Sequence, residues 1–232
     1  SILLAVPMFH VNGWAIPFAA AMAGAKLVLP GPDMSAEAIV KQIQDETVTF
    51  SAGVPTIWLS VVQHLQESGT DVPSLNRLAV GGAAAPRSLM DTLEDEYGVF
   101  VSHVWGMTEM TQGSAGRFTH RVEGLNRDEK RVRQAMAGRE IYGVELRLVD
   151  ERGNDVPRDG TTPGELLARG PWVAGSYFEL DDDSTHIPAT NGVWLRTGDV
   201  ATMDTEGYIS IVDRAKDVIK SGGEWISSIE LE

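Results

Sequence analysis

Five consecutive residues near the middle of the chain combine three side-chain chemistries. Trp105 supplies an aromatic face, Thr108 a hydroxyl and Glu109 a carboxylate, with Gly106 and Met107 between them. An indole stacks on a planar ring such as a nucleobase, and carboxylate oxygen is a ligand that Mg²⁺ prefers. The alternative is an ordinary loop in which the threonine caps a turn. These residues are therefore a candidate nucleotide and metal site.

A second group of charged residues lies near the end of the chain, in segment 213–226, which reads DRAKDVIKSGGEWI. Lys216 and Lys220 are four residues apart and share a face if the segment is helical. These cations repel each other and the nearby Arg214 unless an anion such as a phosphate lies between them. The two glycines that follow allow backbone to approach a ligand closely. The alternative is a charged surface hairpin with a Gly-Gly turn.

Two further segments could contact a ligand. The turn Gly81-Gly82-Ala83-Ala84-Ala85-Pro86 has small side chains, so a flat ring can lie against its backbone near a helix N-terminus. It is a tight strand-to-helix turn in either case. His10 and Trp14 lie in an otherwise apolar segment. A lone histidine in such a segment is more often structural than catalytic, so core packing is the alternative there.

Alternating strands and helices are expected to position these residues. Apolar residues at i, i+3, i+4 and i+7 predict three helices, which begin near Ser35, Pro55 and Pro86. Apolar segments predict strands at 2–6, 26–29, 47–50, 77–80 and 99–104. This alternation predicts an α/β fold with a parallel sheet flanked by helices on both faces. Such sheets bind ligands beyond the carboxyl ends of their strands, where the Gly-rich turn and Trp105 lie.

From Gly143 the pattern changes to short strands separated by turns. Strands are expected near 144–148, 164–169, 193–197 and 208–212. Several short strands without helices predict a small, distorted antiparallel β-barrel. The polar segment 117–133 is interpreted as a surface loop and helix. The expected sub-domains are an α/β part, 1–134, and a barrel, 135–213, followed by the charged segment 214–232.

The composition excludes several classes of protein. The 232 residues suffice for one large domain or two modest ones, and no apolar run is long enough to span a membrane. The absence of cysteine excludes disulfides and thiol nucleophiles. The net charge of -14, from 19 basic and 33 acidic residues, disfavours nucleic-acid and anionic membrane partners. An anionic substrate would need local positive charge such as that of segment 213–226.

Taken together, the motifs resemble the adenylate-forming superfamily of acyl-CoA synthetases, luciferases and peptide-synthetase adenylation domains. The hinge of that superfamily is similar to DRAKDVIKSGGEWIS, and Trp225 resembles the variant of fatty acyl-CoA synthetases. The adenine-and-magnesium motif resembles WGMTE. The gate of the long- and medium-chain enzymes resembles VPMFHVNGW, which contains His10 and Trp14. The structural GEL…GY motif resembles the segment from Gly164 to Tyr177, which is therefore expected to be fold scaffolding.

The resemblance implies a role for each candidate residue. Thr108 would contact phosphate, Glu109 would hold Mg²⁺, and Asp199 of a Thr-Gly-Asp motif would hold the ribose with Arg214. Lys216 would be the pivot of a C-terminal lid. His10 and Trp14 would gate an acyl tunnel. The residues expected at adenine are Gly82, Ala83, Ala84, Trp105, Gly106 and Met107. Those expected to approach the nucleotide or pantetheine in one lid orientation are Lys220, Gly222, Gly223 and Trp225.

This chain departs from the superfamily pattern at two positions. Most members carry tyrosine where this chain has Trp105, which can stack but offers no phenol hydroxyl. Gly13 stands where alanine is common, so the gate is expected to be looser. The phosphate loop of the superfamily is expected before Ser1 and the lid after Glu232. The 232-residue chain alone is therefore expected to be inactive or nearly so.

The implied activity is ATP- and Mg²⁺-dependent ligation of a fatty acid to coenzyme A. The acid would first form acyl-AMP and pyrophosphate, and coenzyme A would then displace AMP. A short-chain or methylthio-alkanoic acid is the alternative substrate. A non-catalytic nucleotide-binding fragment is the alternative from another class. The expected enzyme is cytoplasmic, has no transmembrane segment and is compatible with a homodimer.

Overall fold

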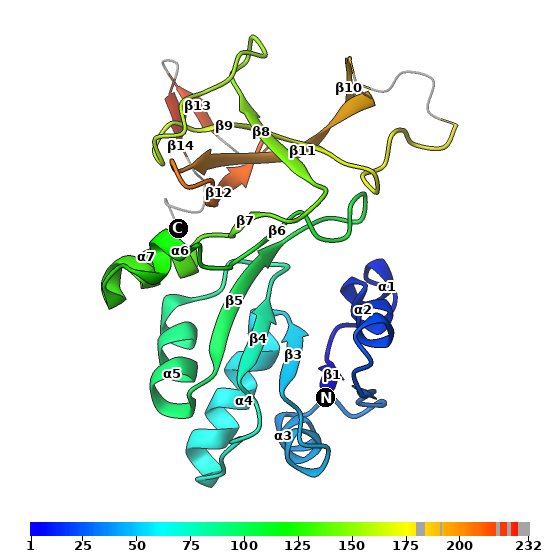
Figure 1. Ribbon diagram of the computed structural model, residues 1–232, viewed down its shortest axis with the longest axis vertical. Helices are drawn as coiled ribbons and strands as arrows, with labels where there is room; N and C mark the ends of the chain where they lie inside the picture. Colours follow the sequence, from blue (N-terminus) through cyan, green and yellow to red (C-terminus); the bar gives the residue numbers. More distant parts are fainter. Residues whose placement is uncertain (180–183, 191, 217–218, 222–223, 227–232) are drawn as a thin grey trace.

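The computed structural model describes residues 1–179, 184–190, 192–216, 219–221 and 224–226. Its first sheet has the strand order β2-β1-β3-β4-β5-β6-β7 (Figure 1). The strands are β1 (Ile2–Leu4), β2 (Leu27–Val28), β3 (Phe50–Gly53), β4 (Arg77–Val80), β5 (Phe100–Trp105), β6 (Ser114–Ala115) and β7 (Arg139–Glu140). β1 to β5 pair in parallel, and β6 and β7 extend the sheet antiparallel. The predicted α/β class is confirmed.

Three helices pack on one face of this sheet: α3 (Ala36–Asp45), α4 (Pro55–Ser68) and α5 (Arg87–Tyr97). α3 begins after Ser35, whose hydroxyl accepts a hydrogen bond from an amide of the first turn. α4 begins with a proline, and both α4 and α5 end at left-handed glycines. The apolar faces of the helices and strands form one buried cluster that includes Trp58. The three helices expected from apolar spacing are confirmed.

The opposite face of the first sheet is covered near β1 and open further along. α2 (Ile16–Met22), which follows the short α1 (Val11–Trp14), packs Ile16 into a small cluster with residues of β1 and β3. Over β4 and β5 this face carries a pocket instead. Helices therefore flank the sheet, but within the described residues they do not cover both faces completely.

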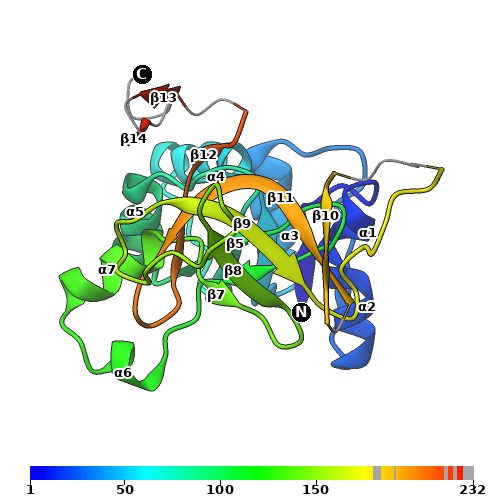
Figure 2. The ribbon, with the colours of Figure 1, turned by 90° about the horizontal axis from the view of Figure 1, so that it is seen from above.

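A second sheet of five antiparallel strands lies above the first in Figure 1 and across its top in Figure 2. Its strands are β8 (Glu145–Val149), β9 (Gly164–Arg169), β10 (His186–Ala189), β11 (Gly192–Met203) and β12 (Ile209–Arg214). β11 is 12 residues long and pairs with β9, β10 and β12. The core of this sheet also buries Met110 and Ala137. β13 (Ile219–Ser221) and β14 (Glu224–Ile226) form a separate pair.

The second sheet does not close into a barrel within the described residues, since no pairing joins β8 to β10 or β12. β12 instead bonds to the chain that leads into β7. The Ala137 amide donates to Ile209 O, and the Ile209 amide donates to Gly138 O, both at 2.8 Å. Because the backbone groups at this edge of β12 are already hydrogen-bonded, they are not available to another strand. The predicted antiparallel strands are confirmed, and they form an open sheet.

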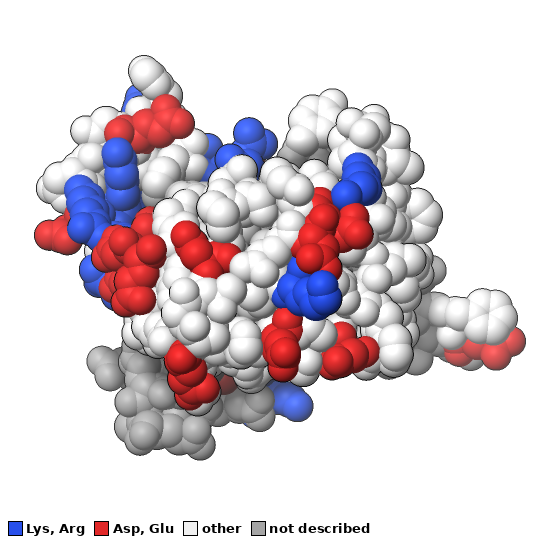
Figure 3. Space-filling model, turned by 90° about the horizontal axis from the view of Figure 1, so that it is seen from below, with Lys and Arg blue, Asp and Glu red and all other residues white. Residues whose placement is uncertain are grey.

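The outer faces of the helices are solvated. Figure 3 shows acidic and basic side chains interspersed over the lower end of the molecule. Exposed pairs such as Lys41 with Asp45 lie on one helix face at i,i+4 spacing. Within the described part of the chain, no helix is both long and apolar enough to cross a membrane.

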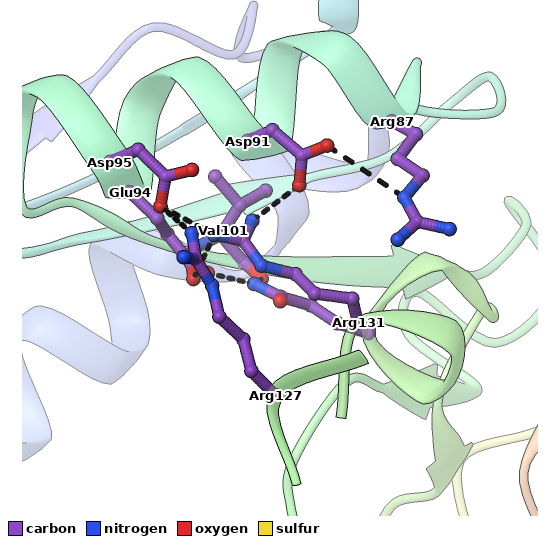
Figure 4. A network of polar contacts seen from close by, with 8 residues as sticks. Arg87, Asp91, Glu94, Asp95, Val101, Arg127 and Arg131 are labelled. Carbon is purple, nitrogen blue, oxygen red and sulfur yellow. Dashed lines mark hydrogen bonds and ion pairs between the residues drawn. The ribbon is translucent and has the colours of Figure 1, made fainter. Parts of the chain in front are cut away.

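A buried arginine fixes α7 to α5. α7 (Arg127–Ala135) follows α6 (His120–Glu123), and the side chain of its Arg131 is only 7% exposed. Arg131 forms ion pairs with three carboxylates of α5 (Figure 4): Asp91 at 2.8 Å, Asp95 at 2.9 Å and Glu94 at 3.3 Å. The interpretation of segment 117–133 as a surface loop and helix is therefore wrong at Arg131.

Replacement of Arg131 by methionine is expected to lower the free energy of unfolding by roughly 2–4 kcal/mol, because three neighbouring carboxylates lose their shared cation. Arg127→Met is the matched control. Arg127 is on the same helix and pairs with Asp95, but its side chain is 66% exposed. We expect this control to lower the free energy of unfolding by at most about 1 kcal/mol. Urea denaturation measures both variants, and equal losses would contradict a special role for Arg131.

Candidate active site

A pocket of about 680 Å³ lies on the open face of the first sheet and reaches the carboxyl ends of β4 and β5. Seven predicted site residues line it: His10, Trp14, Gly82, Trp105, Gly106, Met107 and Thr108. The floor is formed by alternate residues of β3, β4 and β5, including Phe50, Ala79 and Phe100. The floor is therefore mostly apolar but includes Arg77 and Ser102, and polar groups such as Thr108 lie at the upper end.

A tight loop after β5 presents the predicted adenine-and-metal residues. The Gly113 amide donates to Trp105 O at 2.9 Å, which closes the loop at its base. A side chain at Gly106 would place a Cβ 2.0 Å from the carbonyl oxygen of Thr111, so only glycine fits. Met110 is buried in the second core and anchors the loop there. Thr108 at its tip remains exposed.

Asp199 joins this loop to the second sheet. The indole Nε1–H of Trp105 donates to Asp199 Oδ2 at 2.9 Å, across 94 residues of sequence. Arg214 Nε lies 3.1 Å from Asp199 Oδ1. Burial raises the pKa of the Asp199 carboxyl, whereas the hydrogen bond from Trp105 and the charge of Arg214 lower it. An aromatic ring, a buried carboxylate and a guanidinium therefore converge at one place.

The backbone of β11 is irregular around Asp199. The pairing register between β11 and β9 shifts between Arg196 and Val200. Within this irregularity Gly198 has a φ of 73°, which favours glycine. The hydroxyl of Thr197 donates to Leu166 O at 2.8 Å and accepts the Asp199 amide at 3.2 Å. The Thr-Gly-Asp motif thus forms a bulge in the pairing with β9, while Asp199 still pairs with Arg214 of β12.

Glu109 is held from two sides by the segment after β9. The Ala174 amide donates to the backbone carbonyl of Glu109 at 2.8 Å. The Tyr177 hydroxyl donates to Glu109 Oε1 at 2.6 Å. Among the described residues, no group of three or more His, Cys, Asp and Glu side chains gathers around a common point. Mg²⁺ is commonly bound by one or two carboxylates plus substrate phosphates, so a lone Glu109 carboxylate fits such a shared ion.

The predicted gate lies against the turn after β4. A Cβ at Gly81 would be 3.4 Å from the Trp14 ring and 2.6 Å from the Val104 carbonyl oxygen, so this position needs glycine. Gly82 has a φ of 80°. Ala83 and Ala84 are exposed beside it, outside the pocket lining. The gate and the turn therefore form one wall of the pocket.

The gate segment itself has left-handed backbone. Val11, Asn12, Trp14 and Ala15 all have φ between 34° and 58°, and Gly13 has a φ of 64°. Left-handed residues other than glycine cost about 1–2 kcal/mol each. A Cβ at Gly13 would also lie 3.1 Å from Leu4 Cδ1. Gly13 therefore relieves strain in a tightly packed turn, which is a different effect from the looser gate that the sequence suggested.

The remaining predicted residues lie near the end of the chain. Arg214 contacts Asp199, whereas Lys216 is exposed two residues further on. Lys220 and Trp225 lie in β13 and β14, whose side chains are not described. Gly222 and Gly223 lie outside the described residues. Tyr177 was missed as a contact of Glu109, although the GEL…GY motif contains it.

These features define an α/β protein in which a small antiparallel sheet lies over the tips of a mostly parallel sheet. The chain belongs to the AMP-binding enzyme family, whose model matches residues 1–178. It is 49% identical over 228 residues to a 3-methylmercaptopropionyl-CoA ligase of Ruegeria lacuscaerulensis. It is 48% identical over 234 residues to a medium-chain-fatty-acid–CoA ligase of Ectopseudomonas oleovorans. These alignments cover 98% and 100% of this chain but 42% of either relative.

Solved structures agree with this assignment. The fold is similar to that of o-succinylbenzoate coenzyme A synthetase of Bacillus subtilis in complex with ATP and magnesium, at a TM-score of 0.80 and 28% identity. That comparison covers 100% of this chain and 45% of the solved one. The amide bond synthetase of Marinactinospora thermotolerans gives a TM-score of 0.82 at 25% identity, over 100% of this chain and 45% of that one. The chain thus spans less than half the length of the relatives it matches.

Proposed function

We propose that the full-length protein is a cytoplasmic, ATP-dependent ligase that joins a carboxylic acid to coenzyme A. One observation carries this proposal: Asp199 binds both Arg214 and Trp105, and Trp105 lines a pocket with a mostly apolar floor, four residues before Glu109 in the same loop. These side chains are complementary to the adenine ring, the two ribose hydroxyls and the phosphate of a nucleotide. The apolar floor suits the hydrocarbon part of an acid.

The proposed reaction has two displacements. A carboxylate oxygen of the acid attacks the α-phosphorus of ATP, and the bond to pyrophosphate breaks. The sulfur of coenzyme A then attacks the acyl carbon, and AMP leaves. Mg²⁺, when bound, neutralises charge on the phosphates. This chain would hold the adenine against Trp105 and Gly82, accept the ribose hydroxyls at Asp199, and orient phosphate through Thr108 and the cation through Glu109.

The proposed acid is a medium- or long-chain fatty acid. His10 and Trp14 at the pocket wall and the floor residues Phe50, Ala79 and Phe100 support an aliphatic substrate. A short methylthio-alkanoic acid is the second candidate, because the similar relatives include both fatty-acid and 3-methylmercaptopropionyl-CoA ligases. Both acids fit an apolar pocket, and they differ in length.

Acid-dependent exchange of pyrophosphate into ATP by the full-length protein tests this proposal. We compare butyrate, 3-methylthiopropionate, octanoate and palmitate, and follow thioester formation with coenzyme A. Each buried methylene contributes about 0.8 kcal/mol, so kcat/KM for octanoate should exceed that for butyrate by at least about tenfold. The highest kcat/KM with 3-methylthiopropionate would favour the second candidate. Exchange with none of the acids would contradict a ligase.

The isolated 232-residue chain is expected to bind AMP and to release little or no pyrophosphate. It spans 42% of the curated relatives, so much of their machinery lies outside it. Calorimetry with AMP and a pyrophosphate-release assay on this chain check both expectations. Robust pyrophosphate release by this chain would contradict the expectation that it is inactive alone. A folded chain that does not bind AMP would favour a non-catalytic scaffold.

A further inference from the structure

The segment after β9 fixes both ends of Glu109. Ala174 holds its backbone carbonyl and Tyr177 its carboxylate, at 2.8 and 2.6 Å. The two contacts come from residues three apart on one short segment. A hydroxyl that donates to one carboxylate oxygen restricts the rotamer of the glutamate. For Glu109 the bonded oxygen is Oε1, and the second oxygen, Oε2, has no hydrogen bond within the described residues.

The segment that carries Tyr177 is itself fixed to the second sheet. His186 Nε2 lies 2.9 Å from the carbonyl oxygen of Ala174, so this nitrogen carries the proton. In the neutral ring Nδ1 then accepts, and the Thr185 hydroxyl lies 3.1 Å from it. The Tyr177 ring meets the His186 ring edge to face, with centroids 5.7 Å apart. β10, which begins at His186, thereby supports the tyrosine.

The same hairpin supports the other carboxylate of the site. His186 of β10 pairs with Leu195 of β11, and Asp199 lies four residues further along β11. The loop that carries Trp105 and Glu109 is therefore joined to this hairpin directly at Asp199, and indirectly through Ala174 and Tyr177, which both contact His186. These contacts together support the relative position of the two carboxylates.

Tyr177 differs from a purely structural aromatic residue. Its side chain is partly solvent-accessible, with the residue 38% exposed, and its hydroxyl donates to the carboxylate of Glu109. If the Tyr177 ring served packing alone, removal of its hydroxyl would not change metal binding. The next residue, Phe178, is 92% exposed and provides a neighbouring aromatic control.

We propose that Tyr177 is a positioning residue that orients the Glu109 carboxylate toward the magnesium ion of Mg·ATP. The proposal rests on the proposed function, in which Glu109 holds that ion. The hydroxyl fixes Oε1, and Oε2 would then hold the cation. The tyrosine of the GEL…GY segment thus acts at the site through another residue, in addition to any role in the fold.

The test compares the full-length wild type with Tyr177→Phe and with the control Phe178→Leu. Loss of a hydrogen bond to a charged group should raise the Mg²⁺ concentration for half-maximal pyrophosphate exchange about tenfold. At saturating Mg²⁺ the exchange rate should recover to within about threefold. Without divalent metal, the Kd for AMP should stay within about twofold, because the proposed AMP contacts do not involve the hydroxyl. Phe178→Leu should match the wild type in each measurement.

A metal-binding measurement makes the proposal independent of turnover. Free Mn²⁺, counted by electron paramagnetic resonance in the presence of a non-hydrolysable ATP analogue, should show about tenfold weaker Mn²⁺ binding in Tyr177→Phe. Unchanged Mn²⁺ binding would overturn the proposal even if the wild type is an active ligase. Parallel losses in Mn²⁺ and AMP affinity would also overturn it, because they indicate a general structural role. Weaker Mn²⁺ binding in a protein that catalyses no exchange would support Tyr177 and contradict the proposed reaction.

Discussion

Replacement of Glu109 by alanine in the full-length protein will abolish acid-dependent pyrophosphate exchange while the fold stays intact. The carboxylate is the metal ligand in the proposed site, and Mg²⁺ supplies several kcal/mol of charge stabilisation, so we expect a loss of about 10³-fold. The fold should survive because Ala174 bonds to the backbone of Glu109 and Met110 still anchors the loop. Exchange rates across a Mg²⁺ titration, with circular dichroism of the variant, measure both effects.

The control for this variant is Glu67→Ala. Glu67 is an exposed carboxylate on α4 that accepts a hydrogen bond from Gln63 on the same helix. It should leave the exchange rate within about twofold of the wild type, as surface substitutions away from special features usually do. Retention of more than about a tenth of the wild-type rate by Glu109→Ala would remove Glu109 from the metal site.

Replacement of Asp199 by asparagine will weaken AMP binding by about 10–100-fold. The carboxylate has to accept hydrogen bonds from Trp105, Arg214 and the ribose hydroxyls, and an amide offers only one acceptor oxygen. Loss of hydrogen bonds to a charged group accounts for this magnitude. Calorimetry with AMP and with 2′,3′-dideoxy-AMP separates ribose contacts from general damage. The wild type should bind the dideoxy nucleotide about as weakly as Asp199→Asn binds AMP.

The affinity of the Asp199 site for AMP should depend on pH, and the direction of the change can be predicted. Only the deprotonated Asp199 accepts the hydroxyls, and burial raises its pKa, so AMP affinity should begin to fall at a higher pH than for an ordinary aspartate. The hydrogen bond from Trp105 lowers this pKa. In the Trp105→Phe variant, the pH at the midpoint of the loss of AMP affinity should therefore be higher than in the wild type. Titration of the AMP phosphate affects both proteins equally and cancels in the comparison. A midpoint that moves downward would contradict the assigned role of the indole.

Local sequence patterns predicted the elements well. Ile39, Val40 and Ile43 follow Ala36 at i+3, i+4 and i+7, which marks the buried face of α3, and all three are buried. Small residues at Gly81 and Gly106 occupy places where a Cβ would collide with backbone. The motifs after β4 and β5 line one pocket, because the carboxyl ends of parallel strands lie at one edge of a sheet.

Contacts between distant segments could not be read from the same patterns. The bond from Trp105 to Asp199 spans 94 residues, and Asp199 lies in a bulge that no periodicity reveals. Arg131 lies in a segment as polar as any surface helix, but three acids of another helix neutralise it in a buried position. The barrel expected from short strands is an open sheet, because residues 137–138 bond to β12.

The most direct test of the central claim is a crystal structure of the full-length protein with a non-hydrolysable acyl-adenylate. We expect the adenine between Trp105 and the Gly82 turn, the ribose hydroxyls within about 3 Å of Asp199, and the acyl chain along the floor of the pocket. An adenylate bound elsewhere, with Asp199 still bonded only to Trp105 and Arg214, would contradict the account.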